Sequence, residues 1–362
     1  MMTFFDFIKI LLLWPFSLMY GMVLLVRRAF YLFGFAKIQQ AGIPVISVGN
    51  IAAGGTGKTP FAICLSQMLM NRGLTVAVIS RGYKRRVGTA GSGITVVSDG
   101  LNVKCTTAEA GDEPFLMASR LLGTKEKPGA LVIVGKDRAA GAKKAVELGA
   151  QVIILDDGFQ HLRLKRDLDI VLLDSQRPFD NGWLLPAGRL REPKSALRRA
   201  EVIALTRCGA EKQKAESRRR KIKNKSGKAE IFETRHRTGQ PYGFVDRSAP
   251  DREMLKNTRI LLFSGIARPE SFEQSVRQAG LSFTTHLKYS DHHHYSQDQL
   301  KQIAGKARGY DFLFTTEKDT VRLPPDIDFG KPLFVLPVEI EFLDEDQKQK
   351  FEQIVLDKVK IK

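Results

Sequence analysis

The stretch Gly54-Gly55-Thr56-Gly57-Lys58-Thr59 decides the fold, because it follows the apolar run PVISV at residues 44–48 and precedes a helical pattern. A strand, a glycine-rich loop that ends in Lys-Thr, and a helix together form the phosphate-binding site of P-loop proteins. The glycines allow backbone N–H groups to turn toward phosphate oxygens, and the helix N-terminus adds a partial positive charge. We therefore predict that residues 54–59 bind a nucleoside triphosphate, with Lys58 at the β- and γ-phosphates and the Thr59 hydroxyl on Mg²⁺.

One position of this loop departs from the usual G-x-x-x-x-G-K-[ST] spacing, which places glycine at position 52. This chain has Ala52 there, and we expect Gly49 and Gly54 to supply the flexibility instead. The GGTGKT core itself is intact.

A second feature of the sequence complements the P-loop. Four apolar residues, VIIL at 152–155, end in Asp156 and Asp157. A strand that ends in aspartate beside a P-loop is the Walker-B arrangement, which holds Mg²⁺ directly or through water. We therefore predict that Thr59, Asp156 and Asp157 hold the metal.

After the N-terminal apolar segment, apolar runs alternate with helical patterns up to about residue 205. Continuous apolar segments are typical of strands buried on both faces of a parallel sheet, and they occur at residues 75–80, 130–134, 152–155, 170–173 and 202–205. This alternation predicts a doubly wound, mostly parallel α/β sheet of the P-loop NTPase type. We divide the chain into a membrane-associated helix at 1–35, a P-loop core at 36–228 and a smaller α/β lobe at 229–362.

The charge balance indicates an anionic partner. The 362 residues carry a formal net charge of +18, and residues 189–228 alone hold 15 Lys/Arg against four Asp/Glu. Nucleic acid, acidic lipid and a phosphorylated substrate would each fit, and the basic segment is also consistent with a simply solvated helix. No DNA- or RNA-binding motif is recognisable, so we expect no nucleic-acid partner. The three cysteines, Cys64, Cys105 and Cys208, match no metal spacing and are typical of reduced thiols.

The N-terminus carries 17 consecutive uncharged, mostly apolar residues at positions 10–26. A membrane-spanning helix needs about 20 such residues, and Pro15 is expected to kink or end a helix. Trp14 and Tyr20 suit the headgroup interface, and Arg27 and Arg28 suit anionic lipid. We favour a helix that lies in the membrane interface over a transmembrane span or a buried core helix, and we expect no cleaved signal peptide.

Other segments carry side chains suited to phosphoryl transfer. In the GDEP segment, Asp112 is suited to act as a general base on a substrate hydroxyl, or equally to cap a helix. The DHHHY segment offers His292 and its two neighbours, which would orient Asp112, stabilise charge on the phosphoryl group or form a surface cluster. Arg189 and Arg191 lie in a Gly/Pro-rich loop and are suited to clamp a phosphate. The TTEKD segment at 315–319 has a weak similarity to loops that grip purine bases.

Taken together, these segments resemble one family. The segments SVGN, GGTGKTP, SRGY, GDEP, VGKDR, LDDGFQH, PAGRLREP, SDHHHY and TTEKD occur here in the order found in the tetraacyldisaccharide 4'-kinases, the lipid A 4'-kinases of Gram-negative bacteria. The resemblance extends from the N-terminal apolar segment to about residue 323. It implies an ATP-dependent enzyme that phosphorylates the 4'-hydroxyl of a tetraacylated glucosamine disaccharide 1-phosphate to give lipid IVA.

The resemblance also implies roles for individual residues. Asp112 would be the catalytic base, His292 would support it, and Arg191 would contact phosphate. ATP and Mg²⁺ would be the cofactors. The residues that would serve the phosphates, the metal and the position of the P-loop are Lys58, Thr59, Asp156 and Asp157.

The chain is expected to act at a membrane. The resemblance implies a monotopic protein on the cytoplasmic face of the inner membrane, and we expect a monomer. Our hypothesis is that the N-terminal helix and the basic segment 189–228 both face the lipid. The alternative function is a P-loop GTPase or ATPase of the metal-insertion or switch type, which would require a Cys or His metal site.

Overall fold

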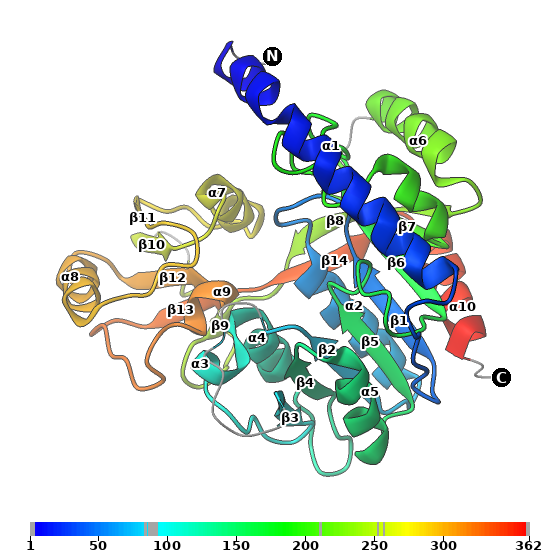
Figure 1. Ribbon diagram of the computed structural model, residues 1–362. Helices are drawn as coiled ribbons and strands as arrows, with labels where there is room; N and C mark the ends of the chain where they lie inside the picture. Colours follow the sequence, from blue (N-terminus) through cyan, green and yellow to red (C-terminus); the bar gives the residue numbers. More distant parts are fainter. Residues whose placement is uncertain are drawn as a thin grey trace.

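Two sheets organise the protein (Figure 1). The computed structural model describes residues 4–82, 85, 93–209, 212–251, 253–255 and 258–359. Within these residues the larger sheet has nine strands in the order β14-β8-β7-β6-β1-β5-β2-β4-β3. In chain order its strands are β1 (Val45–Gly49), β2 (Val76–Ser80), β3 (Ile94–Asp99), β4 (Leu131–Gly135), β5 (Val152–Asp156), β6 (Leu168–Asp174), β7 (Val202–Thr206), β8 (Glu230–Thr238) and β14 (Val338–Phe342).

The larger sheet is mostly parallel, which confirms the predicted fold class. Every pairing from β8 across to β4 is parallel, and the antiparallel strands β14 and β3 form the two edges. Helices α2 (Lys58–Asn71), α4 (Asp112–Arg120) and α10 (Glu345–Val359) pack on one face. The opposite face is covered by α5 (Arg138–Glu147), the 3₁₀ helix η1 (Lys194–Arg199) and α6 (Lys212–Ser226). Because both faces are covered, the central strands are continuous apolar runs.

The strand order places the P-loop where the sheet reverses its direction of growth. β1 pairs with β5 on one side and with β6 on the other, and Val48 lies opposite Asp156. The carboxyl ends of parallel strands meet at one edge of a sheet, and ligands bind outside such a reversal point. The loop after β1 and the carboxylates at the end of β5 are therefore neighbours.

The smaller sheet is built from residues between β8 and β14. Its strands run in the order β11-β10-β12-β13-β9. The strands are β9 (Tyr242–Gly243), β10 (Ile260–Ser264), β11 (Thr285–Lys288), β12 (Phe312–Thr316) and β13 (Leu333–Leu336). The accompanying helices are α7 (Pro269–Gln278), α8 (Gln297–Ala307) and α9 (Glu317–Thr320). Apolar residues on both faces of β10 and β12 give this unit its own core.

The chain does not divide at residue 228 as predicted, because both ends of the 229–362 segment belong to the larger sheet. β8 pairs with β7, and β14 pairs with β8. In α10, the Phe351 ring lies 5.8 Å from that of Phe61 and 5.6 Å from that of Phe232, between ring centroids. The smaller unit is thus an insertion between β8 and β14. A strand's apolar residues are recognisable in the sequence, but the sheet that buries them is not.

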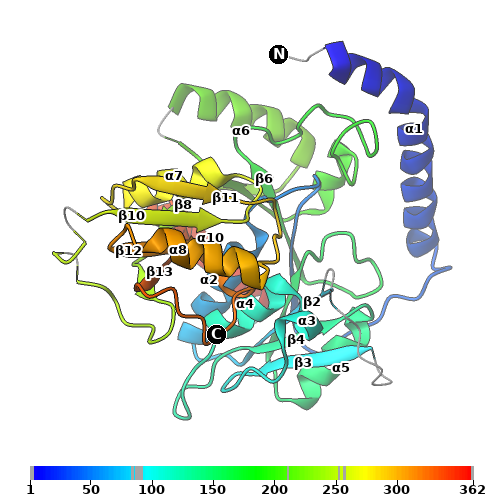
Figure 2. The ribbon, with the colours of Figure 1, turned by 90° about the vertical axis from the view of Figure 1, so that its left-hand side faces the viewer.

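Helix α1 (Phe4–Leu32) lies along one side of the larger unit, where it contacts the loop that carries Leu184, Ala187 and Arg191 (Figures 1 and 2). It continues through Pro15, so the proline does not end the helix, and Figure 2 shows that the helix is bent. Residues Ile10–Leu32 are long and apolar enough to cross a membrane by length and composition, and 6% of their most apolar window is buried. The remaining surface of this helix exposes large apolar side chains. This exposure matches the predicted membrane-associated helix rather than a core helix.

Candidate active site

The P-loop connects β1 to α2, as the sequence predicts. Gly57 precedes the helix with φ of 86°, and Gly54 has φ of 125°, a conformation that suits glycine. A Cβ on Gly49 would lie 2.6 Å from Cβ of Phe159 in the LDDGFQH segment, so this position also requires glycine. Ala52 forms a bridge with Leu190 of the Gly/Pro-rich loop. Gly54 therefore has the backbone freedom expected of it, whereas Gly49 ends β1 and is needed for close packing against Phe159.

Asp157 is held by two cations beside this loop. The guanidinium of Arg191 donates to both of its carboxylate oxygens, at 2.6 and 2.8 Å, and Lys58 Nζ lies 3.6 Å from Oδ1. Burial acts to raise the pKa of Asp157, but the bond from Arg191 and the charge of Lys58 outweigh it and hold that pKa well below its usual range. Arg191 also bonds Oδ1 of Asn50 at the start of the P-loop. The structure thus brings Lys58, Asp157 and Arg191 together as one ion-paired group.

Asp156 is in a different environment. Its Oδ2 accepts a hydrogen bond of 3.0 Å from the Ser80 hydroxyl, whereas Oδ1 is buried without a partner. Burial, followed by the negative charge of Asp157, raises the pKa of Asp156 to about 6. A buried oxygen without a partner is costly unless a ligand satisfies it. This oxygen and the Thr59 hydroxyl at the start of α2 are hard ligands of the kind that Mg²⁺ prefers, so the residues fit the predicted metal.

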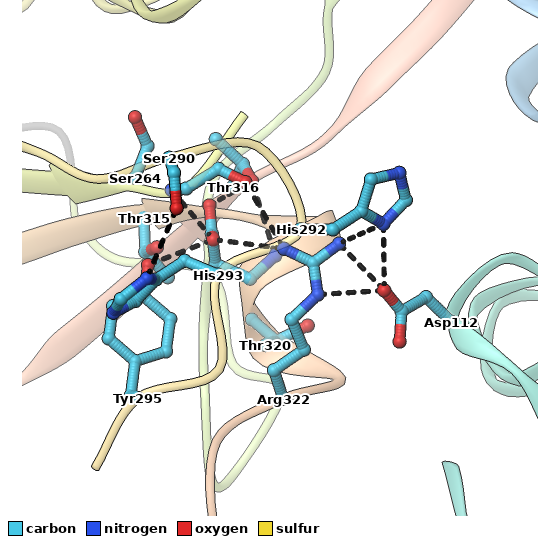
Figure 3. A network of polar contacts seen from close by, with 12 residues as sticks. Asp112, Ser264, Ser290, His292, His293, Tyr295, Thr315, Thr316, Thr320 and Arg322 are labelled. Carbon is cyan, nitrogen blue, oxygen red and sulfur yellow. Dashed lines mark hydrogen bonds and ion pairs between the residues drawn. The ribbon is translucent and has the colours of Figure 1, made fainter. Parts of the chain in front are cut away.

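Asp112 and His292 meet although 180 residues separate them in the sequence. Asp112 is the first residue of α4, and His292 Nδ1 lies 3.1 Å from its Oδ2 (Figure 3). Arg322 contacts the same oxygen through Nε at 2.8 Å and Nη2 at 2.7 Å. Gly111 occupies the N-cap position, and no side chain caps this helix. The carboxylate therefore bonds the histidine and the arginine instead of capping the helix.

The environment of Asp112 keeps its carboxylate ionised. Burial acts to raise the pKa, but hydrogen bonds and charges from His292 and Arg322 outweigh it and lower the pKa of Asp112 to about 2. His292 has φ of 59°, in the left-handed region, and its backbone N–H donates to the Gly265 carbonyl at 3.1 Å. Its neighbour His293 bonds Gln299 and stacks on Tyr289 instead. Of these two histidines, His292 is the one placed to act on Asp112.

Several residues around the site were not singled out from the sequence. Buried Arg138, from the VGKDR segment, donates to the Asp157 carbonyl at 2.8 Å. Arg207 donates to the Gly55 carbonyl in the P-loop at 2.6 Å and pairs with Asp174. Arg322 follows the TTEKD segment by three positions. Only Arg138 lies within a segment that the resemblance quotes, and arginines such as Arg207 and Arg322 do not stand out in a chain with this charge.

The contacts of the TTEKD segment do not fit the suggested role of gripping a purine base. Asp319 is fully buried, and it bonds Thr316, Tyr295 and the Gly265 N–H. Glu317 pairs with Arg120 of α4. Both carboxylates are occupied within the protein, so they are not available to grip a nucleotide base.

The fold and this site define a P-loop phosphotransferase, in which a phosphate-binding loop lies at the reversal point of a parallel sheet and a separate carboxylate is fixed by a histidine and an arginine. Comparison with known proteins identifies the family. The chain matches the tetraacyldisaccharide-1-P 4'-kinase family over residues 9–360, and it belongs to that family. It is therefore a kinase, as the resemblance in the sequence implied.

Individual relatives support this assignment. The chain is 39% identical over 347 residues to the tetraacyldisaccharide 4'-kinase of Syntrophotalea carbinolica, covering 94% of this chain and 91% of that protein. It is 44% identical over 306 residues to the enzyme of the same name from Anaeromyxobacter sp. strain Fw109-5, covering 83% and 78%. The crystal structure of LpxK from Aquifex aeolicus in complex with ATP matches with a TM-score of 0.74 and 30% identity, covering 96% and 98%.

Proposed function

We propose that this chain transfers the γ-phosphoryl group of ATP to the 4'-hydroxyl of a tetraacyldisaccharide 1-phosphate, giving lipid IVA. The family assignment, the named relatives and the ATP bound to the similar solved structure support this reaction. The P-loop residues Gly54 to Thr59 provide the site for the triphosphate. The acceptor is a phosphorylated lipid, which accords with the net charge of +18 and with an apolar N-terminal helix.

The observation that carries this proposal is the contact between α1 and the loop that holds Arg191. The Ser17 hydroxyl donates to the Leu184 carbonyl at 2.9 Å and accepts from the Ala187 N–H at 3.0 Å. The Tyr20 hydroxyl donates to the Arg191 carbonyl at 3.1 Å. The side chain of Arg191 in turn binds Asp157 beside the P-loop. The apolar helix α1 is therefore linked through one loop to the phosphate site. This arrangement suits an enzyme with a lipid acceptor.

Mg²⁺ is the metal that the donor set favours. We assign it to the Thr59 hydroxyl and Oδ1 of Asp156, because Asp157 already bonds Arg191 and Lys58. When bound, the metal neutralises charge that develops on the phosphates during transfer. Asp157 does not bind the metal in this assignment; it positions Lys58 and Arg191 through its ion pairs with them. A metal-inserting GTPase would require a group of three or more His, Cys, Asp or Glu side chains that could hold its metal. The described residues contain no such group.

Asp112 is the base in this proposal. Phosphoryl transfer proceeds through a loose transition state, so the base mainly orients the acceptor hydroxyl and accepts its proton. A pKa of about 2 keeps Asp112 ionised at neutral pH. His292 and Arg322 fix one of its oxygens, which leaves the other for the substrate.

The reaction is tested by incubating the purified full chain in mild detergent with γ-labelled ATP, Mg²⁺ and the tetraacyldisaccharide 1-phosphate. We expect label in a lipid product on thin-layer chromatography. A matched acceptor that lacks the 4'-hydroxyl should give no labelled lipid. Label transfer to both acceptors would contradict the assigned position, and no transfer by a folded, ATP-binding protein would contradict the proposed reaction.

We further propose that the exposed face of α1 holds the enzyme in the interface of the inner membrane, at its cytoplasmic face. Leu18 is 57% and Met22 is 65% exposed, whereas Ser17 on the docked face is 2% exposed. Changing Leu18 and Met22 together to aspartate should weaken binding to phospholipid vesicles by about 100-fold or more, because charge is costly in hydrocarbon. Sedimentation with vesicles measures this.

The matched control for this membrane test changes two exposed apolar residues of the smaller unit, Val245 and Met254, to aspartate. The control protein should sediment with vesicles like the wild type. Both variants should still phosphorylate acceptor dispersed in detergent, since neither change touches the P-loop. Unchanged sedimentation of the Leu18/Met22 variant would show that α1 is not the membrane contact.

A further inference from the structure

Arg322 connects the smaller unit to the catalytic carboxylate of the larger one. It lies just after α9, and its side chain is 1% exposed. Its Nε and Nη2 both contact Oδ2 of Asp112, the first residue of α4. A buried guanidinium loses much hydration energy, so it persists where several partners replace the water.

The partners of Arg322 within its own unit fix its direction (Figure 3). Nη1 donates to the Gly265 carbonyl at 3.1 Å and lies 3.6 Å from Oδ1 of Asp319. Asp319 is itself held by the Tyr295 hydroxyl at 2.9 Å and the Gly265 N–H at 2.8 Å. The guanidinium is thus supported from behind by a buried, satisfied network, and its remaining N–H groups face Asp112 and His292.

The contacts on Asp112 are unequal between its two oxygens. His292 Nδ1, Arg322 Nε and Arg322 Nη2 all approach Oδ2. In the described part of the chain, no hydrogen bond or ion pair is formed by Oδ1, and Figure 3 shows this oxygen turned away from the arginine. A carboxylate held by one oxygen in this way presents the other in a defined direction.

We propose that Arg322 is a positioning residue for phosphoryl transfer, which holds Asp112 by Oδ2 and so directs Oδ1 at the acceptor hydroxyl. The inference rests on the proposed function of Asp112 as the base. In the step, the acceptor O–H bond breaks and its proton moves to Oδ1 of Asp112. The oxygen's electron pair forms the bond to the γ-phosphorus, the bond from that phosphorus to the bridging oxygen breaks, and ADP leaves.

The position of the base then depends on both units of the protein. Asp112 belongs to the larger unit, whereas the two groups that hold it, His292 and Arg322, belong to the smaller one. Those two are also the charged or titratable groups that act on the pKa of Asp112. Loss of Arg322 should therefore both free the carboxylate to rotate and raise its pKa.

The test compares Arg322→Gln, which removes the charge, with Arg322→Lys, which keeps it but loses the paired N–H geometry. In the label-transfer assay, kcat of Arg322→Gln should fall by about 100-fold, as small misplacements of a catalytic group do. The KM for ATP should change by less than about threefold, since the P-loop is untouched. The lysine variant should lie between, and Arg308→Gln, at an exposed arginine of the same unit, should match the wild type.

Two readouts separate positioning from a merely structural role. In an Asp112→Asn background, Arg322→Gln should cost little more, because both changes disable one group. The acid limb of the kcat profile, and the titration of the Asp112 carboxyl followed by ¹³C NMR, should move upward by about 1–3 pH units in Arg322→Gln. If that variant does not fold, Arg322→Lys carries the same measurements, with a smaller shift.

Three results would overturn the proposal: a kcat within about threefold of wild type in folded Arg322→Gln, an equal loss in the Asp112→Asn background, or an unmoved titration of Asp112. The NMR titration does not depend on kinase activity. If wild-type protein fails to label the lipid, the proposed reaction fails, whereas the pairing of Arg322 with Asp112 is still decided by the titration.

Discussion

Replacing Asp112 with asparagine should lower kcat for phosphorylation of the lipid by about 10²–10⁴-fold, the usual contribution of a general base. Asparagine keeps the size and one oxygen of the side chain but does not accept a proton at neutral pH. Oδ2 of Asp112 is already engaged by His292 and Arg322, so the missing function is that of the free Oδ1. Single-turnover label transfer measures the chemical step directly.

Asp298→Asn is the matched control, because it makes the same change in the first turn of α8 on an exposed residue. The control should keep wild-type kcat, and both variants should bind ATP with wild-type affinity. An Asp112→Asn enzyme with kcat within about threefold of wild type would show that another group accepts the proton.

The same Asp112 variant should change how stability depends on pH. The pKa of Asp112 is about 2 in the folded protein, below its ordinary value of 3.8. The ionised carboxylate therefore stabilises the fold above about pH 4, and this stabilisation is lost as pH falls toward 2. At 1.4 kcal/mol per pKa unit, the wild type should lose about 2 kcal/mol of unfolding free energy between pH 5 and pH 2 that the asparagine variant does not lose. Urea unfolding at these two pH values measures the difference.

Replacing Lys58 with alanine should lower kcat/KM for ATP by about 10²–10³-fold, as removal of one oriented donor to a developing charge does. Lys58 is the P-loop lysine at the start of α2, and in this structure it pairs with Asp157 at 3.6 Å. Affinity for ATP should fall, but affinity for AMP should remain near that of wild type, because AMP lacks the β- and γ-phosphates. Equilibrium binding of the two nucleotides, run beside the kinetic assay, distinguishes these effects.

Lys143→Ala provides the control for this change, since Lys143 is an exposed lysine on α5 of the same unit. Its kcat/KM should equal that of wild type. The fold of the Lys58 variant should persist, because Arg191 still pairs with Asp157. Equal losses of AMP and ATP affinity would mean that Lys58 shapes the loop instead of binding the outer phosphates.

Where functional residues lie within one short segment, the sequence predicts the local structure that carries them. The strand, the glycine loop and the helix around Lys58 are contiguous, and each is recognisable from apolar period and residue type alone. The apolar run before Asp156 predicts a buried strand that ends in a carboxylate, and β5 is that strand. The alternation of strands and helices predicts a parallel sheet, whereas the pairing of β1 with β5 is seen only in the structure.

The different roles of Asp156 and Asp157 could not be separated from the sequence. Asp156 ends β5 and Asp157 follows it directly, and the sequence predicts the same metal-binding role for both. The structure pairs Asp157 with Lys58 and Arg191 and leaves one oxygen of Asp156 without a partner. Side-chain direction at the end of a strand depends on the local backbone, and Asp157 has φ of 51°. No pattern in the residues VIILDD reports that angle.

The sequence by itself determined the P-loop, the mostly parallel sheet and the lipid-type helix, because each depends on neighbours along the chain. Resemblance pointed to Asp112 and His292, but the tertiary structure decided that they touch, that Arg322 holds the same oxygen, and that β14 returns to the larger sheet beside β8. These features depend on contacts between residues 100 to 210 positions apart. Such contacts are set by how two cores pack together, and a local pattern carries no record of that packing.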